Sequence, residues 1–178
     1  MGGAKKLQTE VDEAALSTAD AAQALQEITA LLCKRTRAPF ILLARWEDEE
    51  RRASPLAHPG LSAPLADRLC AALAPYRAAC LRADAPLGAL DRAALAALPD
   101  ELRAAKIGGL FVVPLHKAGR PLGLLLLARR TTSLGAAAAR AIEPVRTSLT
   151  LLVEQVVHLE KLSAYSDVAN FDGLTGLH

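Results

Sequence analysis

Apolar residues recur along this chain at helical spacing near both ends and in short unbroken runs between them. From Thr9 to about Lys34 the apolar positions are three or four residues apart, with Glu, Asp and Gln between them, which predicts an amphipathic helix. A second and longer helix is predicted from Ser133 to about Asn170, with Pro144 as the point where it kinks or restarts. Residues 1–8 lack this pattern, and we expect them to be disordered.

The short apolar runs predict β-strands. Phe40–Trp46 and Ala53–Ala57 flank a charged turn, and Gly109–His116 and Pro121–Arg129 flank a short loop that contains glycine. The second pair predicts a β-hairpin. Both of its strands are apolar at nearly every position, so we expect other elements to cover both faces. Pro114 cannot donate a ladder hydrogen bond, which indicates a bulge or an unpaired position there.

The segment between these strand pairs has weaker patterns. Ser62–Leu73 reads as a short helix with Pro64 near its first turn, and Arg77–Arg82 as a brief strand. Short helical turns follow over residues 84–106. Together the elements predict an α+β fold, in which helices pack on a central, mostly antiparallel sheet and long helices stand at both ends.

Composition excludes several classes of protein. With 52% hydrophobic residues the chain can bury a core, so intrinsic disorder is disfavoured. Only 3% of the residues are aromatic, which argues against an all-β fold and against a protein that stacks nucleic-acid bases on rings. The net charge of +2 also lacks the basic excess of a nucleic-acid binder. We therefore expect no nucleic-acid partner.

The sequence predicts neither a membrane partner nor a site for chemistry. No run approaches the roughly 20 apolar residues of a membrane span, and no secretion signal is visible, so a cytoplasmic protein is expected. Cys33, Cys70 and Cys80 have no CxxC spacing and are expected to be buried small residues. No metal, cofactor-binding or catalytic residue is predicted, because ligand-like histidine spacing, a phosphate loop and a nucleophile arrangement are all missing.

The long C-terminal helix carries a heptad-like pattern. Its apolar positions alternate three- and four-residue steps for nearly three heptads: Ile142, Val145, Leu149, Leu152, Val156 and Leu159. We expect the first half of this helix to pack on its own domain. Beyond Glu154 it outruns a compact domain, which favours a coiled coil with a second helix. A homodimer through the terminal helices is therefore predicted.

The hairpin resembles the last hairpin of a GAF domain. The family typically has an apolar strand ending in Val-Pro-Leu, a polar turn with glycine, and a strand containing Gly-Val-Leu or a similar triplet. Val113-Pro114-Leu115, Gly119 and Leu122-Gly123-Leu124 match this pattern. The resemblance covers roughly residues 20–160 and implies a GAF-like sensory domain.

The last seven residues resemble the opening of a GGDEF (diguanylate cyclase) domain. That domain typically begins Asp-x-Leu-Thr-Gly-Leu-x-Asn-Arg, and its fixed positions match Asp172, Leu174, Thr175, Gly176 and Leu177. The resemblance implies a full-length parent that makes cyclic di-GMP from GTP. GTP and magnesium are expected only for that cyclase domain, whose signature loop is absent from the chain.

These resemblances divide the chain into four parts. After the disordered residues 1–8, residues 9–145 form the GAF-like domain with its N-terminal helix. Residues 146–170 form a coiled-coil signalling helix, and 171–178 begin the truncated GGDEF domain. The fragment itself is expected to be catalytically inert.

The signal that the GAF-like part senses stays open. Residues 61–107 contain a single ring, Tyr76, so a cyclic-nucleotide or tetrapyrrole pocket is disfavoured, as are a bilin tethered to Cys70 or Cys80 and a haem held by His58 or His116. One hypothesis is a sensor with a small aliphatic pocket for an unknown ligand. Another is a ligand-free dimerisation and relay module. A third is an adaptor, or a module with a degenerate output domain.

Overall fold

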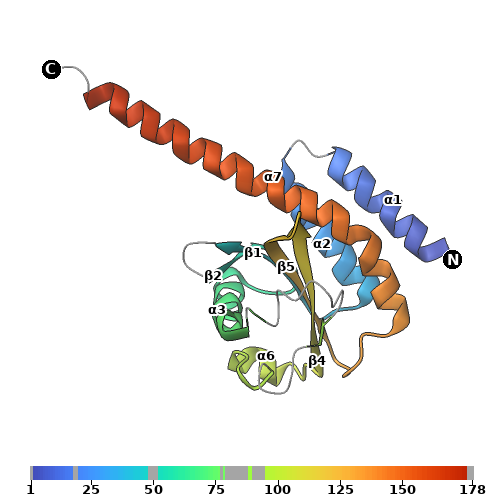
Figure 1. Ribbon diagram of the computed structural model, residues 1–178. Helices are drawn as coiled ribbons and strands as arrows, with labels where there is room; N and C mark the ends of the chain where they lie inside the picture. Colours follow the sequence, from blue (N-terminus) through green and yellow to red (C-terminus); the bar gives the residue numbers. More distant parts are fainter. Residues whose placement is uncertain are drawn as a thin grey trace.

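A computed structural model describes residues 2–17, 20–47, 52–76, 78, 88–89 and 95–175 (Figure 1). Most of the predicted strand at Arg77–Arg82 and most of residues 84–94 lie outside these ranges. Ala78 is described and is helical. Short helical turns were predicted over residues 84–106, but Gly88–Ala89 is a strand. In chain order the elements are α1 (Gly2–Ser17), α2 (Ala21–Thr36), β1 (Ile41–Glu47), β2 (Arg52–Ala57), α3 (Ala63–Leu73), the 3-10 turn η1 (Ala74–Tyr76), β3 (Gly88–Ala89), α6 (Asp100–Ala104), β4 (Gly109–Lys117), β5 (Arg120–Arg129) and α7 (Ala136–Thr175).

The strands form one antiparallel sheet in the order β2-β1-β5-β4-β3. This confirms the predicted α+β class and places the β4–β5 hairpin centrally. Pro114 lies opposite Leu124, and the register shifts between Leu115 and His116. The irregularity expected at the proline therefore occurs one residue later.

Both faces of the sheet are covered, as the unbroken apolar strands predicted. Leu125 and Leu127 of β5 belong to a core cluster with α1, α2 and α7, while Leu124 and Leu126 belong to a second cluster with α3 and α6. This alternation follows from the period of two along a strand. The chain ends build one layer, and the middle of the chain builds the other (Figure 1).

Gly123 permits the close approach of β5 to β1. It lies opposite Arg45 in the ladder, and a Cβ atom there would overlap the carbonyl oxygen of Ala44. The glycine of the Leu122-Gly123-Leu124 motif therefore has a steric role in the sheet.

The N-terminal predictions need two corrections. Residues 1–8 were expected to be disordered, but α1 begins at Gly2, and its Leu7 is only 1% exposed. A single helix from Thr9 to Lys34 was also wrong, because α1 ends at Ser17 and α2 begins at Ala21. The Asp20 side chain accepts a hydrogen bond from the backbone N–H of Ala22 at 2.9 Å, and this cap starts a new helix.

Helix α1 is held against both α2 and α7. Leu7 and Val11 lie one turn apart and are buried in the cluster that these helices share. Arg35 of α2 also donates to both carboxylate oxygens of Glu10, at 2.6 and 2.8 Å. Tertiary contacts of this kind order the start of α1, whose local pattern did not predict a helix before Thr9.

Helix α7 runs unbroken from Ala136 to Thr175 and carries Pro144 in its interior. The predicted division at residue 145 thus falls inside a continuous helix. Its second half projects away from the body of the domain (Figure 1). Within the described residues, no helix is long and apolar enough to cross a membrane.

Candidate functional site: helix α7 and the faces it presents

The sheet face opposite α7 is the place where a ligand pocket was expected. In the described residues it is a packed aliphatic layer, in which Leu69 and Leu73 of α3 and Leu102 of α6 are buried with Leu42 and Leu126 of the sheet. Phe40 and Trp46 are the rings of this cluster. Such a surface offers apolar contact and few polar anchors.

The two cysteines that the structure describes are poor nucleophiles. Burial, together with the negative charge of Asp67, raises the pKa of the Cys70 thiol to about 12. Burial also raises the pKa of Cys33, whose Sγ lies 3.2 Å from the carbonyl oxygen of Ala38. Because the thiolate is the reactive form, neither thiol is set up for nucleophilic chemistry or for tethering a chromophore. Cys80 lies outside the described residues.

His58 and His116, for which haem binding was disfavoured, are in ordinary surroundings. Nδ1 of His58 lies 3.1 Å from the carbonyl oxygen of Leu61, within the turn that leads into α3. His116 stands near the end of β4, beside α7. Among the described residues no three His, Cys, Asp or Glu side chains gather in a way that would hold a metal ion.

The inner face of α7 is buried in the domain. Five of the six heptad positions lie in the core cluster shared with α1, α2 and the sheet: Ile142, Val145 and Leu149 are fully buried, and Leu152 and Val156 are 8% exposed. Leu159 is 52% exposed. The chain's own helices thus cover most of the seam predicted for a second copy, and those five side chains are not available to a partner.

Two ion pairs between elements fasten α7 to the sheet. Lys117, at the end of β4, pairs with Glu154, and Arg45 of β1 pairs with Glu160. Both partners in the first pair are partly exposed, so its contribution is small. The pairs nonetheless show how far along its length α7 remains in contact with the domain, namely to residue 160.

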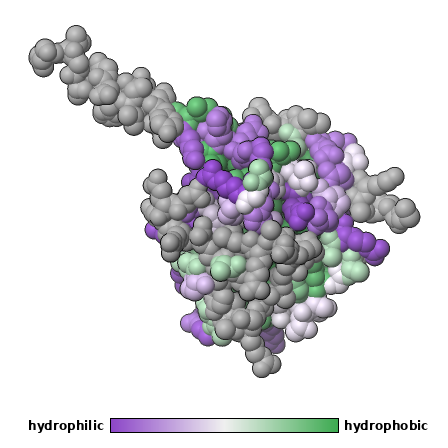
Figure 2. Space-filling view, in the orientation of Figure 1, coloured by the Kyte–Doolittle hydropathy of each residue, from purple (hydrophilic) through white to green (hydrophobic). Residues whose placement is uncertain are grey.

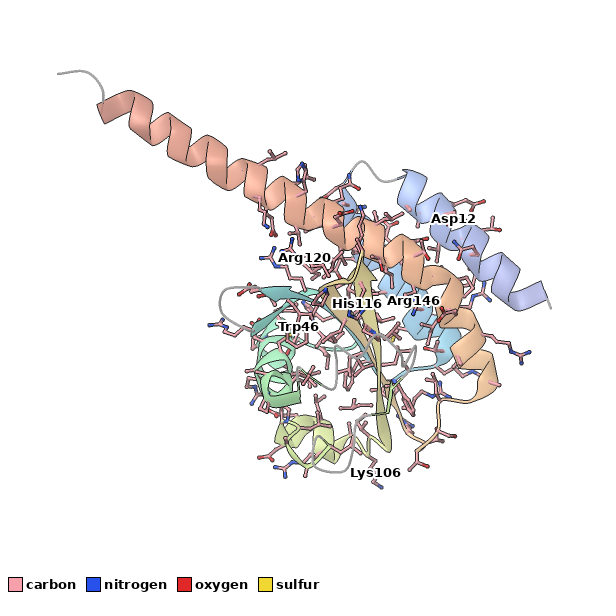
Figure 3. All side chains as sticks on the ribbon, viewed as in Figure 1. Asp12, Trp46, Lys106, His116, Arg120 and Arg146 are labelled. Atoms are coloured by element: carbon pink, nitrogen blue, oxygen red, sulfur yellow. The ribbon has the colours of Figure 1, made fainter. Side chains whose placement is uncertain are left out.

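A groove of about 410 Å³ separates α7 from the hairpin end. It is lined by Pro114, His116, Lys117, Ala118, Arg146, Thr147, Thr150 and Leu151. His116 and Arg146 lie beside each other where α7 crosses the hairpin (Figure 3). The cations are already matched locally, since Arg146 pairs with Glu143 at 3.0 Å and Lys117 pairs with Glu154. The groove is therefore close to electrically neutral.

The outer face of α7 carries exposed leucines. Leu151 is 53% exposed, and Leu159 and Leu162 are each 52% exposed. Figure 2 shows hydrophobic surface where α7 leaves the body of the domain. Leu159 is one of the predicted heptad positions, whereas Leu151 and Leu162 are not. No apolar periodicity marked these two leucines, because the positions between them on the same side of the helix are Gln155 and His158.

The junction motif lies at the far end of α7. The backbone is helical through Asp172, Leu174 and Thr175. Their side chains, and Gly176 and Leu177 altogether, lie outside the part of the chain that the structure describes.

No protein-family model matches the chain, and no curated protein matches it in sequence. Among solved structures it is similar to the GAF domain of a phosphoenolpyruvate-protein phosphotransferase from Coxiella burnetii, with 18% identity, a TM-score of 0.65, and coverage of 90% of this chain and 96% of that one. It is also similar to the phycoerythrobilin-bound GAF domain of a cyanobacterial phytochrome, with 12% identity, a TM-score of 0.62, and coverage of 90% and 99%.

A third similar structure is an enzyme, the free methionine-R-sulfoxide reductase of Neisseria meningitidis in complex with its substrate. It is 14% identical, with a TM-score of 0.60 and coverage of 85% of this chain and 88% of that one. The chain therefore adopts the GAF fold. At these identities the likeness extends to the fold alone, and the three proteins differ in what they do.

Proposed function

We propose that this chain is the regulatory GAF module of a bacterial signalling protein, and that it controls a C-terminal diguanylate cyclase that makes cyclic di-GMP from GTP. The observation that carries the proposal is the path of α7. The helix enters the domain core at Ile142, is tied to the sheet as far as Glu160, and runs unbroken to Thr175. It ends within the Asp172–Leu177 segment that resembles the start of a GGDEF domain.

A helix with this path transmits a change mechanically. Ile142 and Leu149 are packed in the core, so a rearrangement of the domain must move α7. A rigid helix carries that rotation or tilt to its far end. In the cyclase family two GTP-bearing domains must face each other, so small changes in helix geometry alter the encounter of the reacting groups. Regulation that acts through the rotation or tilt of α7 needs no catalytic residue in this chain.

The packed aliphatic layer indicates which kind of ligand the module could bind. The described residues around α3 and α6 supply apolar contact, which favours a small apolar ligand or no ligand. The same observation supports the second candidate function, a ligand-free dimerisation or adaptor module with a degenerate output domain. The two candidates differ in whether the full-length protein turns over GTP.

The test uses the full-length protein that carries this chain. Conversion of GTP to cyclic di-GMP is measured for the wild type and for insertions between Ser163 and Ala164, beyond the ion pairs of α7. A two-residue insertion rotates the two ends of the helix relative to each other by about 200°, whereas a seven-residue insertion changes their phase by only about 20°. We expect the first to change the rate strongly and the second to restore most of it.

Two outcomes contradict this proposal. Absence of GTP turnover in the wild-type protein favours the adaptor function. Equal rates in all three proteins mean that α7 is a passive linker. A thermal-shift screen of the purified chain with small apolar compounds then separates a ligand-binding module from a ligand-free one, since a ligand of the folded state raises Tm.

A further inference from the structure

The face of the sheet that α7 covers ends in charged side chains. Side chains alternate along a strand, so Ile41, Leu43, Arg45 and Glu47 of β1 lie on one face of the sheet. The first two belong to the core cluster that includes α7, and the last two follow them at the end of the strand. The apolar contact between sheet and helix therefore gives way to charges where α7 leaves the domain.

Arg45 contacts carboxylates on two different elements. Its Nη1 atom pairs with Glu160 of α7, and its Nη2 atom lies 3.7 Å from Oε1 of Glu47 on its own strand. The same Oε1 atom accepts a hydrogen bond from the hydroxyl of Ser54 on β2, and Ser54 lies opposite Arg45 in the ladder. These four side chains, which we call the Arg45 network, connect β2 through β1 to α7.

The two carboxylates hold Arg45 unequally. The distance of 3.7 Å to Glu47 is longer than a hydrogen bond, so Glu160 is the closer partner in this arrangement. Arg45 is 24% exposed, and its Nε atom is buried without a hydrogen bond among the described residues. A partly buried guanidinium needs a carboxylate nearby, and the network supplies a second one. Glu160 is 50% exposed, so water solvates it readily when Arg45 leaves.

We propose that Arg45 is a positioning residue that exchanges between Glu160 and Glu47, and that this exchange sets the point at which α7 leaves the domain. With Arg45 on Glu160 the helix is held to the sheet as far as residue 160. With Arg45 on Glu47 the last contacts are the core side chains Val156 and Val157, so the free part of α7 begins about one turn earlier.

Ser54 connects this exchange to the rest of the domain. Its hydroxyl occupies the Glu47 oxygen that faces Arg45, and its strand, β2, contacts α3 on the opposite face of the sheet. A movement of α3 and β2 that withdraws the hydroxyl leaves Glu47 free to take Arg45. A change on one face of the sheet thus biases the two arrangements of a helix on the other face. The regulatory use of this exchange rests on the proposed function.

Hydrogen exchange in the purified chain tests the proposal, because the amides of residues 158–163 lie just beyond the core contacts of α7. Glu160→Gln removes the holding carboxylate, and Ser54→Ala frees Glu47 to compete for Arg45. We expect each substitution to speed amide exchange in this segment by about two- to fivefold. Glu143→Gln is the matched control, since that carboxylate pairs with Arg146 within α7, and it should leave the segment unchanged.

A double variant separates exchange from a static network. If Glu47 competes for Arg45, Glu47→Gln alone does not speed amide exchange, and Ser54→Ala combined with Glu47→Gln returns the segment to the wild-type rate. A network that is merely structural gives no such rescue. Three results overturn the proposal: no effect of Ser54→Ala, faster exchange in Glu47→Gln, or a double variant as fast as Ser54→Ala. Circular dichroism checks that every variant is folded.

The outcome is separable from that of the GTP assay. Amide exchange in the expected order without GTP turnover in the full-length wild type leaves the role of Arg45 standing and removes the cyclase. Insertions that change cyclic di-GMP synthesis, together with equal amide exchange in all variants, leave the proposed function standing and overturn the role of Arg45.

Discussion

The inner and outer faces of α7 have similar side chains and opposite surroundings. Leu149 is fully buried, whereas Leu151, on the opposite side of the helix, is 53% exposed. The difference arises from α1, α2 and the sheet, which cover the inner face and stop short of the outer one. A heptad-like pattern therefore identifies an apolar face but does not say whether the same chain or another one covers it.

The two faces of α7 are also expected to contribute to different properties of the chain, namely the stability of its fold and its self-association. Substitutions on the inner face are expected to change the free energy of unfolding, whereas substitutions on the outer face are expected to change self-association.

The largest effect is expected for Leu149→Ala on the inner face. This side chain is fully buried, and its truncation leaves a cavity in the shared cluster, which costs about 2–5 kcal/mol. Chemical denaturation of the purified chain measures the loss. Leu151→Ala is the matched control on the opposite face of the same helix, and an equal loss in both variants would remove the distinction between the faces.

Val11→Ala tests whether α1 covers the inner face. Val11 is fully buried although it lies near the chain's start, so removing two methyl groups should lower the free energy of unfolding by about 2 kcal/mol. The exposed Glu13 on the same helix provides a control, Glu13→Ala. If Val11→Ala left stability unchanged, α1 would not be docked in solution.

Lys117→Ala removes the ion pair with Glu154 at the border between the faces. Both side chains are partly exposed, at 48% and 39%, so the free energy of unfolding should fall by no more than about 1 kcal/mol. Lys161→Ala removes an exposed cation from the same part of the molecule and serves as the comparison. A loss of several kcal/mol would mean that the pair is far better shielded from water than its exposure indicates.

Leu159→Ala should have the smallest effect on unfolding, within about 0.5 kcal/mol in dilute solution, because the side chain is half exposed. Its effect on self-association should be larger, about a tenfold weakening measured by sedimentation. The reverse pattern, with stability lost and association kept, would place Leu159 in the core.

Much of the fold could be predicted because its signals are local. The hairpin from Gly109 to Arg129 is marked by two apolar runs and a glycine-containing loop, and the structure places β4 and β5 there. Covering of the sheet on both sides also followed, since strands that are apolar at every position have no face for water. The α3 boundaries agree with the prediction to within one residue.

The N-terminus and the candidate site were harder to predict. Val11 lay inside a predicted helix, but Leu7 alone does not mark one, and its burial depends on contacts with α2 and α7. The break before α2 depends on the Asp20 side chain, which caps this helix. Other residues that can cap a helix lie nearby in the sequence, so the position of the break was hard to predict. Leu151 and Leu162 were missed because the inner heptad is more regular, and regularity does not reveal exposure.

The amino-acid sequence by itself determined the strands β1, β2, β4 and β5, the helical periods and the motif at Asp172–Leu177, because these depend on neighbouring residues and on backbone preferences. The tertiary structure decided which apolar face of α7 is buried, where α1 packs, and where α7 leaves the domain. Those outcomes depend on which distant segments pack together, and a periodic pattern records the polarity of a face without recording its partner.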